Sequence, residues 1–267
     1  MKIGFIGLGN MASAMIGGII KNGVLDPKEI LGSTKTKASL RKAEEEFGIC
    51  TMEDNVSVAE QADMLILSIK PQMYEEVIGQ IKGSIKKDAV IVSIAPGKTL
   101  DWLADCFGFK KGEGKLVRCM PNTPALVMEG CTGVCFSKAI TEEEKEQVLK
   151  ILQSFGKALV VPEHLMDTVV GVSGSAPAYV FLFIEALADG AVAEGMPRKQ
   201  AYEFAAQAVY GSAKMVLETG KHPAELKDMV CSPGGTTIEA VSVLEKTGFN
   251  SSIIEAERAC IHKSRQL

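Results

Sequence analysis

Residues 3–12 read IGFIGLGNMA, and this segment indicates how the first half of the chain folds. Ile3–Ile6 is a short apolar run typical of a buried strand, and the residues after the glycines have helical spacing. Gly7 permits a tight turn, Gly9 lets the backbone approach a pyrophosphate, and Ala12 lets the helix pack on the strand. The context favours a dinucleotide-binding turn over a plain glycine-rich turn. We expect six of its residues to contact the cofactor: Ile6, Gly7, Leu8, Gly9, Asn10 and Met11.

The residues on either side of this turn alternate between short apolar runs and helical segments. Alternation of this kind indicates an α/β fold with a parallel sheet. We therefore predict a Rossmann-type dinucleotide-binding domain over residues 1–162. Its expected strands are 3–6, 29–32, 64–69, 89–94, 115–119, 132–136 and 158–161, and its expected helices are 12–21, 37–47, 73–81, 100–107 and 141–155.

The second half of the chain contains helical patterns and no strand-like runs. We predict an all-helical domain over 163–267, with helices at 176–194, 197–218, 223–230, 236–245 and 251–263. The helix 176–194 is apolar on nearly every face, so it should be buried all round. A domain of this size has few helices with which to cover it. We therefore expect a partner subunit to supply the cover.

Composition excludes several functional classes. The chain has 267 residues and a formal net charge of −4, which argues against a nucleic-acid partner. The longest uncharged run, Thr168–Ile184, is interrupted by glycines, serines and a proline, so we predict a buried helix and no membrane span. We expect a cytoplasmic protein because no export signal is evident. Neither the seven scattered cysteines nor the three distant histidines have the spacing of a metal site, so none is predicted.

The residues after the second expected strand bear on the choice of cofactor. An NAD-preferring site usually has an acidic residue there, which binds the ribose 2′-hydroxyl. Here Ser33 and Thr34 occupy the position, with Lys35 and Lys37 close by. We expect Ser33, Thr34 and Lys35 to contact NADP(H), because hydroxyls and ammonium groups suit a 2′-phosphate and nothing in this stretch repels one. The use of NAD(H) stays an open alternative. A second open alternative is that both lysines are ordinary solvated helix residues.

Two further strand ends should frame the cofactor, because ligands of open α/β sheets bind beyond the carboxyl ends of the strands. Proline and small residues there leave room for a flat ring, although simple loop chemistry explains them as well. The predicted contacts are Ser68, Ile69, Lys70 and Pro71 after one strand, and Ser93, Ile94 and Ala95 after the next.

A glycine-rich loop in the second half opens the helix 236–245. Gly234, Gly235 and Thr236 place free backbone N–H groups at a helix N-terminus, which suits a carboxylate or a phosphate. Thr237 adds a hydroxyl that can donate or accept at a reacting nitrogen. A plain capping loop explains the glycines equally well. No side chain in this half is placed as an evident general acid.

In these motifs, the sequence resembles the pyrroline-5-carboxylate reductase family. The resemblance spans essentially the whole chain. It is carried by GLGNMA at 7–12, KP at 70–71, RCMPNTP at 118–124, GSAPAY at 174–179, LKD at 226–228 and SPGGTT at 232–237.

This resemblance implies a fold, a reaction and further site residues. It implies that the helical domain interlocks with that of a second subunit, as an obligate homodimer, and leaves open a decamer built of dimers. The implied reaction is hydride transfer from NAD(P)H to a cyclic imine carboxylate, which gives L-proline. By resemblance, Asn55 joins Ser33 at the adenosine phosphate end of the cofactor. The implied substrate contacts are Glu163, Ser232, Gly234, Gly235, Thr236 and Thr237, with Thr237 as the catalytic residue at the ring nitrogen.

Several alternatives stay open. A related two-domain reductase of the ketopantoate or β-hydroxyacid type normally uses a lysine in the helical domain, but no lysine here lies in a glycine-rich entry loop. A nucleotide-binding sensor without turnover is the other class. Cys231 departs from the Ser or Thr that is commoner in the family, and it is either a reactive thiol or a small buried residue. The sequence also leaves open activity on six-membered cyclic imines.

Overall fold

The computed structural model describes residues 1–110 and 112–266, which form two compact units. Unit 1 comprises Met1–Ser175 together with the residues from Cys260 onward, and unit 2 comprises Ala176–Ala259. The Cys260 thiol donates a hydrogen bond to the Ser175 hydroxyl at 3.2 Å, so the two points at which the chain crosses between the units are adjacent. Residues 163–175, which the sequence assigns to the second domain, have their contacts in unit 1.

Unit 1 is built on one eight-stranded sheet, in the order β3-β2-β1-β4-β5-β6-β7-β8. Its strands are β1 (Ile3–Ile6), β2 (Ile30–Ser33), β3 (Cys50–Met52), β4 (Met64–Leu67), β5 (Val90–Ser93), β6 (Leu116–Met120), β7 (Gly130–Phe136) and β8 (Gly156–Val160). All neighbours are parallel except β6 and β7, which are antiparallel. The expected α/β fold with a parallel sheet is therefore confirmed, with the exception of this one pair, and strand β3 was not predicted.

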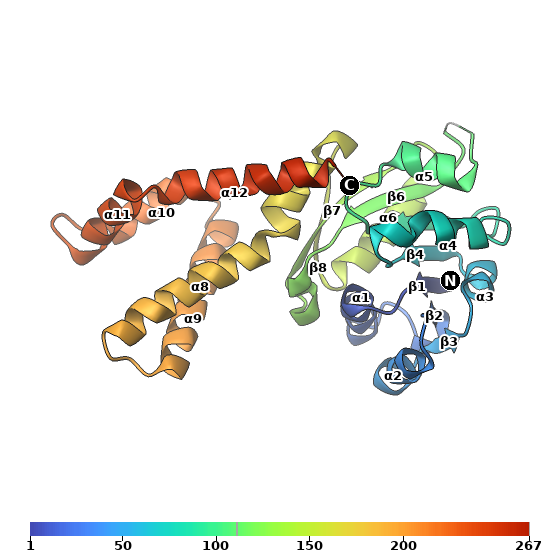
Figure 1. Cartoon of the computed structure of the whole chain (residues 1–267), viewed down its shortest axis with the longest axis horizontal. Helices are drawn as coiled ribbons and strands as arrows, with labels where there is room; N and C mark the ends of the chain where they lie inside the picture. Colours follow the sequence, from blue (N-terminus) through green and yellow to red (C-terminus); the bar gives the residue numbers. More distant parts are fainter. Residues whose placement is uncertain (111, 267) are drawn as a thin grey trace. The chain divides into compact units, whose positions relative to one another are not determined.

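Helices cover both faces of this sheet (Figure 1). Helices α1 (Asn10–Lys21), α2 (Lys37–Phe47) and α6 (Glu142–Gln153) contribute side chains to the apolar cluster on one face. Helices α3 (Asn55–Gln61), α4 (Tyr74–Ile81) and α5 (Leu100–Phe107), with the short α7 (Met166–Val169), contribute to the other. The hydrophobic core is thus two layers that sandwich the sheet, which holds the ends of the strands in fixed positions.

The strand order reverses direction between β1 and β4. From β1 the chain moves outward through β2 to β3, and it then returns to β4 on the other side of β1. Connections diverge at such a switch point and leave a crevice beyond the carboxyl ends of the two strands. Ligands of open α/β sheets bind in this crevice, so the fold itself indicates where to look for a site.

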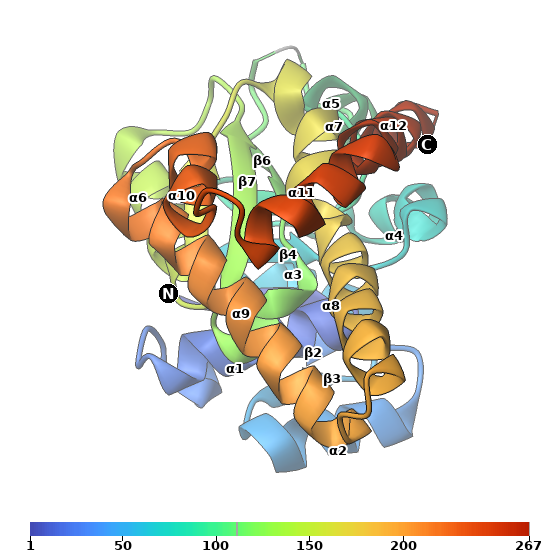
Figure 2. The same ribbon diagram turned by 90° about the vertical axis from the view of Figure 1, so that its left-hand side faces the viewer.

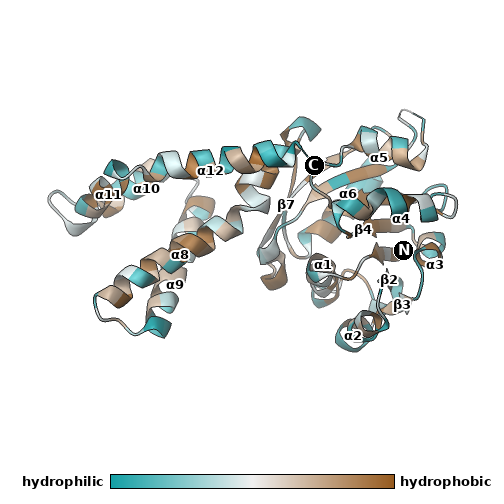
Figure 3. Ribbon diagram, viewed as in Figure 1, coloured by the Kyte–Doolittle hydropathy of each residue, from teal (hydrophilic) through white to brown (hydrophobic). Residues whose placement is uncertain are grey.

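Unit 2 consists of helices α8 (Ala176–Ala193), α9 (Arg198–Thr219), α10 (Pro223–Val230), α11 (Thr236–Lys246) and most of α12 (Phe249–Ser264). Helices α8 and α9 lie side by side (Figure 2). Apolar residues run along α8 (Figure 3), yet Ala188 is its only buried residue. The expectation that this helix is buried all round is therefore not met within one chain, where Phe181 and Leu182 are 63% and 67% exposed.

One helical stretch, Glu163–Ala193, is long and apolar enough to cross a membrane by length and composition alone. Only 11% of its most apolar window is buried within the chain. A surface this apolar requires a cover, and either lipid or a second protein chain would provide one. Among the described residues, no group of three or more His, Cys, Asp or Glu side chains could hold a metal ion.

Candidate cofactor pocket and substrate loop

The glycine-rich turn between β1 and α1 brings the backbone to the switch point. Gly7 has a φ of +94°, and a Cβ there would lie 2.6 Å from the Ser68 carbonyl oxygen, so only glycine fits. Its N–H donates to the Ser33 carbonyl at 2.9 Å. Gly9 is the N-cap of α1 and makes no side-chain cap, and a Cβ there would meet nothing within 4 Å. The turn therefore leaves open space directly in front of the free N–H groups of a helix.

A pocket of about 680 Å³ opens in front of this turn, within the size range of small-molecule sites. Ten of the predicted cofactor contacts line it: Ile6, Gly7, Leu8, Gly9, Thr34, Lys35, Asn55, Ser68, Ile69 and Lys70. These ten residues come from four separate segments of the sequence, and the sheet brings them together. Six further residues line the pocket without having been predicted: Glu53, Asp54, Met73, Glu76, Val77 and Gln80.

The remaining predicted cofactor residues do not line the pocket: Asn10, Met11, Ser33, Pro71, Ser93, Ile94 and Ala95. Ser33 is buried and its hydroxyl donates to Asn55 Oδ1 at 2.8 Å. The amide of Asn55 in turn donates to Gln80 Oε1 at 3.1 Å, so Ser33 orients a pocket residue from below. A direct contact of these seven residues with the cofactor stays a prediction.

Ser93 is also buried, beneath the carboxyl ends of β4 and β5. Its hydroxyl donates to the Tyr74 hydroxyl at 3.1 Å, and Tyr74 donates to the Leu67 carbonyl at 2.7 Å. Burial raises the pKa of the Tyr74 phenol, so this group stays protonated as a donor. The pair thus fixes the ends of two strands that border the pocket.

Charges of both signs surround the outer part of the pocket. Lys35 makes no ion pair with any described residue, whereas the Lys37 ammonium lies 3.0 Å from a carboxylate oxygen of Glu53. Asp54 caps α3, and hydrogen bonds from the Ser57 backbone N–H and hydroxyl lower its pKa, so it is ionised at neutral pH. The stretch after β2 itself contains no acidic residue, but three carboxylates from other segments, Glu53, Asp54 and Glu76, line the same pocket and repel a phosphate.

The predicted substrate loop lies in unit 2, between α10 and α11. The Gly235 N–H donates to the Ser232 carbonyl at 3.0 Å, which closes a turn in which Gly234 has a φ of +66°. Gly235 is the N-cap of α11 and makes no side-chain cap, and a Cβ there would clash with the Ser232 hydroxyl. The N–H groups of Thr236 and Thr237 therefore have no helical acceptor. The structure thus brings together Ser232, Gly234, Gly235, Thr236 and Thr237.

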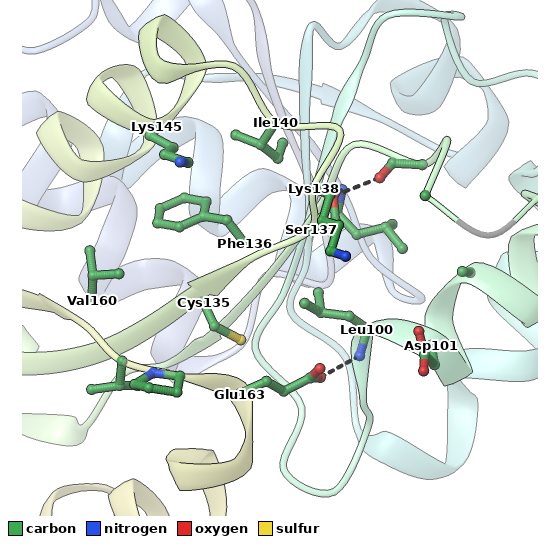
Figure 4. Close-up of a pocket in the computed structure, with 16 residues that line it drawn as sticks. Leu100, Asp101, Cys135, Phe136, Ser137, Lys138, Ile140, Lys145, Val160 and Glu163 are labelled. Carbon is green, nitrogen blue, oxygen red and sulfur yellow. Dashed lines mark hydrogen bonds between the residues drawn. The ribbon is translucent and has the colours of Figure 1, made fainter.

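Glu163 lines a second hollow of about 780 Å³ within unit 1 (Figure 4). One oxygen of its carboxylate accepts a hydrogen bond from the Leu100 N–H at 2.6 Å and lies 3.8 Å from an Arg118 nitrogen. Burial raises the pKa of the neighbouring Cys135 thiol to about 12, so this thiol is no nucleophile at neutral pH. Glu163 does not line the cofactor pocket, and its predicted contact with substrate stays a prediction.

A buried ion-pair network lies behind Glu163, and sequence reasoning missed it. Arg118 is 2% exposed and lies 3.3 Å from Asp167 Oδ1. The Ser264 hydroxyl donates to the same oxygen at 2.9 Å. Arg118 was noted only as part of a family motif, because nothing in an apolar strand sequence indicates which charge will be buried beside which carboxylate.

Comparison with known proteins identifies the two parts of the chain. Residues 2–97 match the family model described as NADP oxidoreductase, coenzyme F420-dependent. Residues 163–267 match the one described as pyrroline-5-carboxylate reductase dimerisation. The pyrroline-5-carboxylate reductase of Escherichia coli (strain K12) is 52% identical over 266 residues, covering 100% of this chain and 98% of that protein.

Two more distant relatives agree with this match. The pyrroline-5-carboxylate reductase of Methanosarcina acetivorans is 43% identical, covering 100% of this chain and 97% of that protein. A crystal structure of the Plasmodium falciparum pyrroline carboxylate reductase with NADP bound has a TM-score of 0.89 and 31% identity, covering 100% of this chain and 97% of the other. The fold, the motifs and these full-length matches together establish that the chain belongs to the pyrroline-5-carboxylate reductase family.

Proposed function

We propose that this protein reduces 1-pyrroline-5-carboxylate to L-proline with NADPH, the last step of proline biosynthesis. The single observation that carries the proposal is the full-length match to pyrroline-5-carboxylate reductases at up to 52% identity. Two features of the structure, which do not depend on that match, also fit the reaction. One is a dinucleotide pocket at the switch point, and the other is an anion-binding loop with a hydroxyl beside it.

The residues of unit 1 fit a dinucleotide. The open space at Gly9 and the uncapped start of α1 suit a pyrophosphate. The Asn55 amide, oriented by Ser33 and Gln80, and the Lys35 ammonium suit the adenosine end of NADP(H). NADPH, when bound, supplies the hydride that reduces the imine carbon. The structure with NADP bound from Plasmodium falciparum supports this choice of cofactor.

The residues of unit 2 fit the substrate. The free N–H groups of Thr236 and Thr237 at the start of α11 suit its carboxylate. The Thr237 hydroxyl suits the ring nitrogen. A cyclic imine is basic enough to be protonated near neutral pH, and an iminium carbon accepts hydride readily. The hydride forms the new C–H bond at C5, the C=N π pair returns to nitrogen, and proline results. No separate general acid is required, and alignment of the reactants is the main task of the protein.

Replacement of Thr237 by alanine is expected to lower kcat by about tenfold to a hundredfold, because one well-placed hydrogen bond to the reacting group is lost. Steady-state kinetics with pyrroline-5-carboxylate at saturating NADPH measures the effect. The Thr237→Ser variant keeps the hydroxyl and is the matched control. If the alanine variant retains full activity, Thr237 has no catalytic role.

One assay separates this function from its rivals. NADPH oxidation is followed with pyrroline-5-carboxylate, with ketopantoate and without substrate. We expect turnover with pyrroline-5-carboxylate alone. Turnover with ketopantoate alone indicates the other reductase class, and cofactor binding without turnover indicates a sensor. A six-membered cyclic imine in the same assay tests the breadth of the substrate class.

The dimerisation domain makes the protein a homo-oligomer, and we propose that its basic assembly is an obligate homodimer in the cytoplasm. A second copy would cover the apolar faces of α8 and α9, where Phe181, Phe204 and Leu217 are more than 60% exposed. Covering them with protein explains the apolar stretch Glu163–Ala193 without a membrane.

Sedimentation velocity without detergent is expected to give twice the mass of one chain, or an even multiple if dimers assemble further, up to a decamer of subunits. Leu217→Glu is expected to shift the protein to monomer or to aggregates, because a charge cannot be buried unpaired in an apolar interface. Lys150→Glu makes a larger change of charge at an exposed position of α6 in unit 1 and should leave the mass unchanged. A dimer that survives Leu217→Glu would show that this face is not the interface.

A further inference from the structure

The acidic residue that is absent after β2 is supplied by the neighbouring strand. Strands β2 and β3 are parallel neighbours, and Ser33 pairs with Met52 in the register. The next residues along the two strands are Thr34 and Glu53, which therefore lie across from each other at the same edge of the sheet. Both line the cofactor pocket. Glu53 thus stands one strand away from the position that an acidic residue occupies in NAD-preferring sites.

The lysine charges around this position, which attract a phosphate, are partly offset by carboxylates. The Glu53 carboxylate lies 3.0 Å from the Lys37 ammonium, and both side chains are more than 70% exposed. It therefore offsets one of the two lysine charges that would otherwise attract a 2′-phosphate. The adjacent Asp54 is held ionised by its bonds to Ser57. With Lys35 and Asp54 included, these four side chains together carry no net charge, and Glu76 adds a third carboxylate to the lining of the pocket.

We propose that Glu53 sets the balance between NADPH and NADH in this enzyme. A carboxylate here repels a 2′-phosphate and can accept a hydrogen bond from a free 2′-hydroxyl, so it discriminates partly by disfavouring one ligand. Asp54 cannot be varied cleanly because it caps α3, whereas the contact of Glu53 among the described residues is its exposed ion pair with Lys37. This inference rests on the proposed use of a nicotinamide dinucleotide.

The test measures binding without catalysis. The apo protein is titrated with NADP⁺ and with NAD⁺ in a calorimeter, with no substrate present. Glu53→Gln is expected to raise the ratio of NADP⁺ to NAD⁺ affinity by roughly threefold to tenfold, mainly through tighter NADP⁺ binding. Glu53→Lys should raise it further. Both increases in the affinity ratio should be smaller in 0.5 M NaCl, because the Debye screening length falls to about 3–5 Å at this ionic strength.

A matched control separates a local effect from a change in total charge. Glu46→Gln removes the same charge from the far end of α2, where Glu46 is exposed and makes no ion pair with any described residue. It should leave the affinity ratio within twofold of the wild type. The melting temperature of all three variants should stay close to that of the wild type.

Three results would overturn the inference. The first is an affinity ratio that Glu53→Gln leaves unchanged, and the second is an equal tightening of both dinucleotides. The third is the same shift from Glu46→Gln. In each of these cases the wild type still binds dinucleotide, so the proposed function stands. If the wild type binds neither dinucleotide, the proposed function falls together with this inference.

Discussion

Replacement of Gly9 by valine is expected to weaken NADP⁺ binding by roughly a hundredfold while the protein stays folded. A Cβ at Gly9 meets nothing within 4 Å, and its φ of −81° is open to any residue. The added side chain therefore occupies only the space in front of α1. A pyrophosphate displaced from that space by about 1 Å loses its alignment with the N–H groups of the helix.

The measurement is a calorimetric titration with NADP⁺ beside a urea unfolding curve. The free energy of unfolding of Gly9→Val should change by less than about 1 kcal/mol, the scale of an N-cap effect. Gly7→Ala provides the contrast. Gly7 has a φ of +94°, and a Cβ there would lie 2.6 Å from the Ser68 carbonyl oxygen. This variant should therefore lose about 1–3 kcal/mol or more of unfolding free energy, in addition to NADP⁺ affinity. Unchanged NADP⁺ affinity in Gly9→Val would show that the pyrophosphate lies elsewhere.

Replacement of Arg118 by methionine is expected to lower the free energy of unfolding by about 3–5 kcal/mol. Arg118 is 2% exposed and is flanked by the carboxylates of Glu163 and Asp167. Methionine fills much of the volume but leaves both carboxylates without their cation. The cost comes from the uncompensated charges and should be near the lower end, because both carboxylates are partly exposed.

Urea unfolding at neutral pH, followed by circular dichroism, measures this loss. Lys145→Gln is the control, since its pair with Glu142 is a surface pair on one helix and should contribute less than about 0.5 kcal/mol. A loss below 1 kcal/mol in Arg118→Met would contradict the role of the network. Retention of NADP⁺ binding in the folded fraction would separate this effect from a defect in the cofactor pocket.

Sequence patterns predict much of unit 1 because buried strands and amphipathic helices have distinct periodicities. They do not predict β3, since three residues, Cys50–Met52, are too few to show a period. The patterns predict β7 as a strand but not its antiparallel direction, because an apolar run is the same in both directions. Its direction is set by the short turn Thr123–Val127, which joins β6 to β7 where a crossover helix would be needed for a parallel pair.

The candidate site likewise has a part that the sequence predicts and a part that it does not. The glycine turn is predictable because GxGxxA has one structural meaning between a strand and a helix. Glu53 is not, because its place in the pocket depends on the register of a strand that the sequence does not reveal. Phe181 and Leu182 show a further limit, since their cover comes from outside the single chain.

The return of the chain from unit 2 to unit 1 has a consequence for the order of folding during synthesis. Residues from Cys260 onward belong to unit 1, and Ser264 donates to Asp167 there. The ribosome makes these residues only after the whole of Ala176–Ala259. During synthesis, unit 1 can therefore form its last contacts only after the whole of unit 2 has been made. Loss of the segment after Ala259 would therefore destabilise the nucleotide-binding unit, although the whole helical unit separates that segment from the rest of unit 1 in the sequence.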